Sequence, residues 1–148
     1  DVDLMGAVHA TRAVLPDMVE AGWGRIVNIA STAALTGMAY VSAYCAAKHA
    51  LLGFTRALAI EMVRKGITVN AICPGYADTD IVADAIANIT AKTGRSREEA
   101  LASLLAHNPQ RRLVQPDEIG ETVAWLCSDA AASVTGQGIV LAGGELMP

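Results

Sequence analysis

Three short runs of apolar and β-branched residues constrain the fold of this chain more than any other feature. They are residues 25–30 (RIVNIA), 67–73 (ITVNAIC) and 138–142 (GIVLA). Each has the length and composition of a buried strand, and long helical segments separate one run from the next. Strands joined in this way pair in parallel, through connections that we expect to be right-handed. The sequence therefore predicts an α/β fold with a doubly wound parallel sheet.

Helical spacing of apolar residues surrounds these runs. Helices are predicted over 3–20, over 43–65, on both sides of 92–95 within 80–107, and from Pro116 to about Cys127. Gly66 follows the second helix directly, as expected because glycine tolerates the left-handed conformation that often ends helices. Ser96 precedes Glu98 and Glu99 and is a predicted amino-terminal cap.

Composition agrees with one buried core and excludes several classes of partner. Hydrophobic residues make up 53% of the chain, and the net charge of −4 comes without a Lys/Arg cluster. Nucleic-acid binding and a membrane span, which needs roughly 18 apolar residues, are therefore not expected. Cys45, Cys73 and Cys127 show neither disulfide nor zinc-ligand spacing. We expect a cytoplasmic protein with no metal site.

Polar or helix-breaking residues follow the first two predicted strands. Ser31-Thr32 comes after the first strand, and Pro74-Gly75 interrupts the second. Doubly wound sheets bind ligands outside the carboxyl ends of their strands. The candidate site is therefore expected at this edge of the sheet.

Ser31, Tyr44 and Lys48 form the most informative group at this edge. Tyr44 and Lys48 are four residues apart in a predicted helix, which places phenol and ammonium on one face. A phenol has a pKa of about 10 and is a poor base at neutral pH, whereas a nearby cation favours the phenolate. Ser31 lies 13 residues before Tyr44, where its hydroxyl could hold a substrate oxygen during proton exchange.

Several motifs occur together in this sequence and in a particular order. They are Ile29-Ala-Ser31, Tyr44-x-Ala-Ala-Lys48, Asn70-x-x-x-Pro74-Gly75, Pro116-x-Glu118-Ile119, Thr135-Gly-Gln137 and Gly143-Gly144. With these motifs the chain resembles the short-chain dehydrogenase/reductase family over essentially all of its 148 residues. The resemblance implies a Rossmann-type sheet, of which this chain supplies the second half.

The family resemblance also implies roles for the site residues. Ser31, Tyr44 and Lys48 would be catalytic, and Tyr44 and Lys48 would also contact the cofactor, NAD or NADP. Pro74, Gly75, Ala77 and Thr79 would form the loop beside the nicotinamide. The implied reaction is hydride transfer between the nicotinamide and a small secondary alcohol or ketone. The nearest likeness is to reductases of 3-oxoacyl or polyketide-type substrates.

Asp3 departs from the family pattern. Family members carry an Asn in a Val-Asn-Leu-x-Gly context, whose side chain organises a proton-relay water, whereas this sequence reads Val2-Asp3-Leu4-Met5-Gly6. Asp3 could anchor a water or pair with Lys48, and its negative charge would oppose formation of the tyrosinate.

The resemblance places residues 1–148 as the carboxyl-terminal part of one dinucleotide-binding catalytic domain, with the first βαβ units and their phosphate loop absent. It further implies a homo-oligomer, either a dimer or a tetramer, and a lid formed by residues 80–107. Three alternatives stay open. They are a dehydratase or epimerase that retains its nicotinamide, a non-catalytic truncated subunit, and a substrate phosphate neutralised by Arg111-Arg112.

Overall fold

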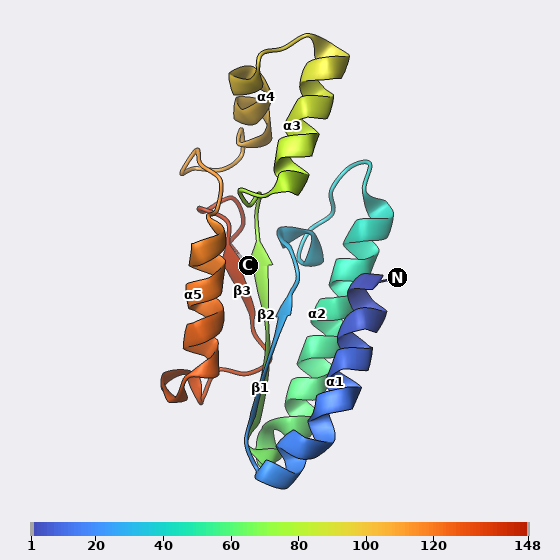
Figure 1. Ribbon diagram of the computed structural model, residues 1–148, viewed down its shortest axis with the longest axis vertical. Helices are drawn as coiled ribbons and strands as arrows, with labels where there is room; N and C mark the ends of the chain where they lie inside the picture. The colour runs from blue at the N-terminus through green and yellow to red at the C-terminus, as the bar shows by residue number, and fades with distance from the viewer. Residues whose placement is uncertain (1, 148) are drawn as a thin grey trace.

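The three apolar runs form the strands of one parallel sheet in the computed structural model, which describes residues 2–147 (Figure 1). The strands are β1 (Gly24–Ile29), β2 (Ile67–Pro74) and β3 (Gly138–Leu141), and they lie in the order β1-β2-β3. Gly24 pairs with Ile67, and Ala71 pairs with Gly138. All three carboxyl ends therefore meet at one edge of the sheet, as predicted.

The helices also lie where the apolar spacing predicts them. They are α1 (Val2–Ala21), α2 (Ser42–Met62), α3 (Asp80–Thr93), α4 (Arg97–Leu104) and α5 (Pro116–Cys127). The shorter 3₁₀ turns are η1 (Thr32–Ala34), η2 (Val63–Lys65) and η3 (Asp129–Ala131). The predicted helix 43–65 is thus α-helical only to Met62 and tightens into η2 before Gly66. Ser96 caps α4 with a complete capping box, as expected.

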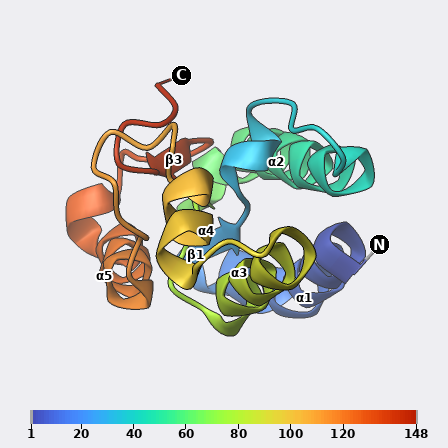
Figure 2. The same ribbon diagram turned by 90° about the horizontal axis from the view of Figure 1, so that it is seen from above.

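Side chains of β2 alternate between the two faces of the sheet. Val69, Ala71 and Cys73 belong to the clusters that pack against α2. Ile72 points the other way and packs with Leu126 of α5. Figure 2 shows the same arrangement from above, with α1 and α2 on one side of the strands and α5 on the other. Every residue of β2 is buried, as in a strand covered on both faces.

The expectation that both connections are right-handed is wrong for one of them. The strands follow one another in sequence order, but α2 covers one face and α5 covers the other. Two successive connections that advance in the same direction over opposite faces must have opposite hands. The β2 to β3 connection also contains α3 and α4, so it is much longer than the single crossover to which the right-handed preference applies.

Helices α3 and α4 form a separate unit beyond the carboxyl edge of the sheet (Figure 1). Val82, Ile86 and Ala100 are buried in their own hydrophobic cluster. Leu105 is also buried, whereas the side chain of Ile81 is exposed. Most apolar residues of this segment therefore hold its two helices together.

Within residues 2–147, none of the helices has the length and apolarity needed to cross a membrane.

At the opposite edge of the sheet, Gly66 lies in close contact with the backbone of Gly22 and Gly24. Gly66 has φ 73°, and its carbonyl oxygen accepts a hydrogen bond of 3.4 Å from the amide of Gly24. A Cβ at Gly66 would overlap the carbonyl oxygen of Gly22. Gly94 has a similar φ of 70°, but a Cβ there would meet no neighbour.

Gly66 and Gly94 share a left-handed backbone but differ in their neighbours, and this difference yields a stability prediction. Gly94→Ala in the complete protein should lower the free energy of unfolding by about 1 kcal/mol, the cost of a left-handed alanine. Gly66→Ala should cost more than about 3 kcal/mol, because backbone must also move apart. Urea unfolding of the two variants measures the difference. Equal losses would mean that the contact at Gly22 has no energetic weight.

Candidate active site

Ser31 lies at the carboxyl edge of the sheet, directly beyond β1. The amide of Ala30 donates a hydrogen bond of 2.7 Å to the carbonyl of Ile72, so strand pairing continues up to Ser31. Ser31 then caps η1, and its Oγ accepts a hydrogen bond of 3.1 Å from the amide of Ala33. Because a hydroxyl also carries a proton, Ser31 can still donate to a ligand oxygen.

Tyr44 and Lys48 lie in the first two turns of α2, which packs beside η1. Lys48 Nζ is 5.6 Å from the centroid of the Tyr44 ring, as the spacing of four residues predicts. Tyr44 is 42% exposed and thus accessible to a ligand.

Lys48 is held by two oxygen atoms from two other elements. Its Nζ donates a hydrogen bond of 2.8 Å to Oδ1 of Asp3 in α1 and one of 3.2 Å to the carbonyl of Ile29 in β1. The Lys48 side chain is only 10% exposed, so these contacts replace the water that an ammonium would otherwise bind. Of the two alternatives for Asp3, the structure has the direct ion pair with Lys48.

The predicted cofactor loop, residues 74–79, is braced from one side by Val114. The amide of Asp78 donates to the carbonyl of Val114, and the amide of Val114 donates to the carbonyl of Tyr76, both at 2.9 Å. Because successive peptide groups of an extended segment point in opposite directions, the amide and carbonyl of Ala77 face away from Val114. Thr79 Oγ1 lies on that side, 3.4 Å from the Ala77 carbonyl oxygen. The loop thus presents a donor, an acceptor and a hydroxyl together.

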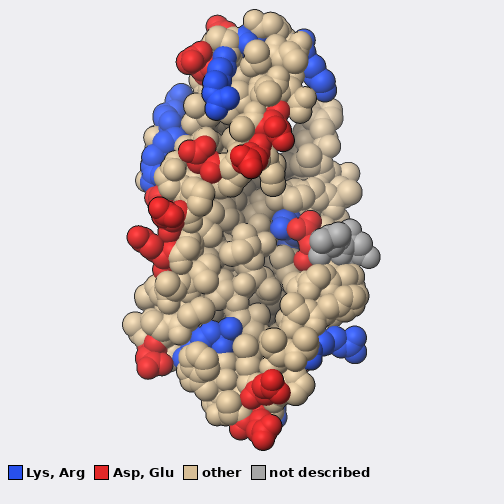
Figure 3. Space-filling view, in the orientation of Figure 1, with Lys and Arg blue, Asp and Glu red and all other residues tan. Residues whose placement is uncertain are grey.

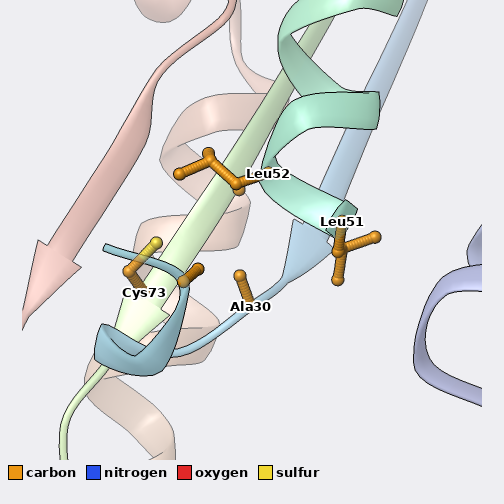
Figure 4. Close-up of a cluster of buried hydrophobic side chains, with 6 residues drawn as sticks. Ala30, Leu51, Leu52 and Cys73 are labelled. Atoms are coloured by element: carbon orange, nitrogen blue, oxygen red, sulfur yellow. The ribbon is translucent and has the colours of Figure 1, made fainter. Parts of the chain in front are cut away.

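A hydrophobic cluster supports these residues from below. Figure 4 shows this cluster, with Leu51 and Leu52 on α2, Cys73 on β2 and Ala30 directly after β1. Burial raises the pKa of the Cys73 thiol, and the backbone amide of Ser31 opposes this effect only in part. Cys73 is therefore a neutral packing residue directly beneath Ser31.

Comparison with known proteins agrees with this geometry. The family model described as enoyl-(acyl carrier protein) reductase matches residues 1–145. The chain belongs to the short-chain dehydrogenase/reductase family. It is 43% identical over 91% of its length to a D-beta-hydroxybutyrate dehydrogenase of Cupriavidus necator, of which it covers 53%. It is 42% identical over 99% of its length to a 3-oxoacyl-[acyl-carrier-protein] reductase of Pseudomonas aeruginosa, of which it covers 55%.

A solved structure of the family places the chain within a larger fold. The crystal structure of an actinorhodin polyketide ketoreductase variant with NADPH matches with a TM-score of 0.90 and 43% identity. The match covers 97% of this chain and 56% of that one. The three-stranded sheet is therefore part of a Rossmann-type fold, and the chain spans about half the length of the curated relatives it matches.

Arg112 is paired within the chain, which argues against the alternative in which Arg111-Arg112 neutralises a substrate phosphate. Its guanidinium donates to both carboxylate oxygens of Glu118, at 2.6 Å and 2.7 Å. This pairing, together with the Gln115 amide, lowers the pKa of Glu118 to about 2.

Charged side chains are scattered over the face seen in Figure 3, with few in its middle. Among residues 2–147, no group of three or more His, Cys, Asp or Glu side chains could hold a metal ion.

Two features of this family site lie outside the reach of sequence motifs. The Ile29 carbonyl that holds Lys48 and the Val114 backbone that braces the loop act through peptide groups, which every residue type provides. The position of Cys73 beneath Ser31 follows only from the pairing of β1 with β2. No residue type in the sequence signals these contacts.

The thiols provide a test of this site geometry. In the folded complete protein, iodoacetamide should alkylate the exposed Cys127 at least about tenfold faster than the buried Cys45 and Cys73, because thiolates react and burial disfavours them. Peptide mass spectrometry over time measures the three rates. Labelling in denaturant should make the rates similar. Fast labelling of Cys73 in the folded protein would contradict its placement beneath Ser31.

Proposed function

We propose that the complete protein transfers hydride between the nicotinamide of NAD or NADP and a small secondary alcohol or ketone. The observation that carries this proposal is the Lys48 ammonium fixed beside the Tyr44 phenol, at the sheet edge that also holds Ser31. The oxidoreductase names of its relatives support hydride transfer over a dehydratase or epimerase. One relative's name indicates a 3-oxoacyl substrate, which we propose as the substrate type.

Each catalytic side chain has one task in this reaction. Ser31 donates its hydroxyl proton in a hydrogen bond to the substrate oxygen, while its Oγ stays fixed by the Ala33 amide. Tyr44 Oη gives a proton to that oxygen during ketone reduction and takes it back during alcohol oxidation. Lys48 stabilises the tyrosinate through its positive charge and donates a hydrogen bond from its third N–H to a ribose hydroxyl.

The residues at the sheet edge fit a nicotinamide cofactor. A carboxamide offers one acceptor and two donor hydrogens, and the amide and carbonyl of Ala77 with the hydroxyl of Thr79 match these groups. The Pro74-Gly75 turn sets the direction of this loop, because the Gly75 amide is bonded to the carbonyl of Leu141 at 3.0 Å. When bound, the cofactor supplies or accepts the hydride.

Three properties of the complete protein belong to the same proposal. Residues 1–148 form the carboxyl-terminal part of one dinucleotide-binding catalytic domain, which the length of the relatives supports. The protein acts in the cytoplasm as a homo-oligomer. Exposed apolar side chains on the helices, such as Ile60 and Val63 near the end of α2, support subunit association.

The role of Tyr44 predicts the effect of removing one oxygen atom. Tyr44→Phe in the complete protein should lower kcat by at least about a thousandfold, because the proton donor is lost, with cofactor affinity nearly unchanged. Tyr40 is fully exposed in the turn that precedes α2, so Tyr40→Phe is the matched control and should retain normal kcat. Steady-state kinetics and fluorescence titration of NADH and NADPH provide the measurements. Normal turnover in Tyr44→Phe would refute the assignment.

Lys48 should influence both chemistry and binding. Lys48→Met is expected to lower kcat by at least about a hundredfold and to weaken cofactor binding, because the ammonium acts on phenol and ribose together. Lys65→Met, which removes an exposed ammonium in η2, should change neither quantity. The same kinetic and fluorescence measurements apply. Unchanged cofactor affinity in Lys48→Met would remove the ribose contact from the mechanism.

A further inference from the structure

The proposed mechanism uses Lys48 but leaves its shortest contact without a role. Asp3 Oδ1 lies 2.8 Å from Lys48 Nζ, although 45 residues separate the two in sequence. The Lys48 side chain is nearly buried, whereas that of Asp3 is 43% exposed. The carboxylate therefore reaches from the surface of α1 to the ammonium that is proposed to act on Tyr44.

We propose that Asp3 is a positioning residue that holds the Lys48 ammonium in place and limits the effect of its charge on Tyr44. This inference rests on the proposed hydride-transfer function and adds an internal regulator of its proton step. Two separable properties of Asp3 are involved. Its oxygen atom accepts a hydrogen bond, and its negative charge offsets that of the ammonium.

The hydrogen bonds of Lys48 define the first property. An ammonium has three N–H donors, and Asp3 and the Ile29 carbonyl occupy two of them. These oxygens come from α1 and β1, so they fix Nζ from two directions before any ligand binds. The third donor is left for a ligand hydroxyl. Loss of the Asp3 oxygen would leave the long, flexible side chain with one protein partner, and ligand binding would then have to order it.

The charges define the second property. An isolated ammonium at the distance of Lys48 from Tyr44 favours the tyrosinate. A carboxylate in contact with that ammonium cancels part of its field and adds its own repulsion toward a phenolate. Asp3 should therefore weaken the support that the Lys48 charge gives to a phenolate at Tyr44, and removal of the Asp3 charge should restore that support.

Other titratable groups near Lys48 are present in every variant that is compared. Cys73 on β2 lies within the influence of both Lys48 and Arg56, and its burial raises the pKa of the thiol. On α2, Nδ1 of His49 is 2.9 Å from the Cys45 carbonyl oxygen, and the Cys45 thiol is buried. Arg56 lies two turns beyond Lys48 on α2, roughly 12 Å along the helix. These groups remain the same in each comparison below.

Two substitutions separate the two properties of Asp3. Asp3→Asn keeps an acceptor oxygen but removes the charge, and Asp3→Ala removes both. Asp17→Asn is the matched control, because Asp17 is an exposed carboxylate near the other end of α1. All variants are made in the complete protein. The rate of alcohol oxidation is measured against pH, and cofactor affinity is measured by fluorescence titration.

A spectroscopic readout tests the charge effect without turnover. Ultraviolet difference spectra of the cofactor-free protein follow tyrosinate formation with pH, and the same titration of a Tyr44→Phe background isolates the Tyr44 signal. Asp3→Asn should move this signal and the oxidation profile to lower pH than in the unchanged protein. Asp3→Ala should bind cofactor about fivefold to tenfold more weakly than Asp3→Asn, because Lys48 loses a hydrogen bond.

The possible outcomes separate this inference from the proposed function. Asp3→Asn profiles that match those of Asp17→Asn would overturn the charge effect. Equal cofactor affinity in Asp3→Ala and Asp3→Asn would overturn the positioning effect. If the complete protein oxidises no alcohol, the proposed function fails, but the tyrosinate titration still decides whether Asp3 controls Tyr44. Should Asp3→Ala fail to fold, Asp3→Ser, with a shorter acceptor, takes its place in the affinity comparison.

Discussion

Burial of β2 on both faces is the constraint on which the rest of the structure depends. Helix α2 covers one face and α5 covers the other, so polar groups inside this layer must find partners there. Asn70 does so, because its side chain bonds to the Val134 carbonyl and the Gln137 amide. The strand leaves the core only where Pro74-Gly75 ends it. Reactive side chains are thereby restricted to the carboxyl edge of the sheet.

Helix α2 connects the core to the chemistry of that edge. Leu51, Leu52 and Leu58 pack against the sheet, while the amino-terminal turns of the same helix carry Tyr44 and Lys48. The ammonium is therefore fixed by the packing of the whole helix as well as by its own hydrogen bonds. A nearly buried cation is costly unless oxygen atoms surround it, and α1 and β1 supply those atoms. Core packing and the geometry of the candidate site thus depend on the same helix.

Local patterns in the sequence predicted most of the fold, and they singled out Ser31, Tyr44 and Lys48, which the structure brings to one edge of the sheet. Strand and helix positions came within a few residues of the structure, because periodicity and end signals such as Gly66 and Ser96 are local. The hand of the β2 to β3 connection was not predictable, since it depends on which face α5 covers. The contact of Lys48 with Ile29 was equally hidden, because it is made by a peptide carbonyl that any residue would provide.

The loop beside the proposed nicotinamide site is physically coupled to the α3–α4 segment. Thr79 precedes the first residue of α3, and Val114, which braces Tyr76 and Asp78, follows α4 in the chain. Tyr76 itself packs in the cluster that holds α3 to α4. A ligand that orders Ala77 and Thr79 would therefore restrain both ends of this segment at once. If this segment closes over a substrate as the sequence predicts, closure and cofactor binding would share one set of backbone hydrogen bonds, and each would influence the other.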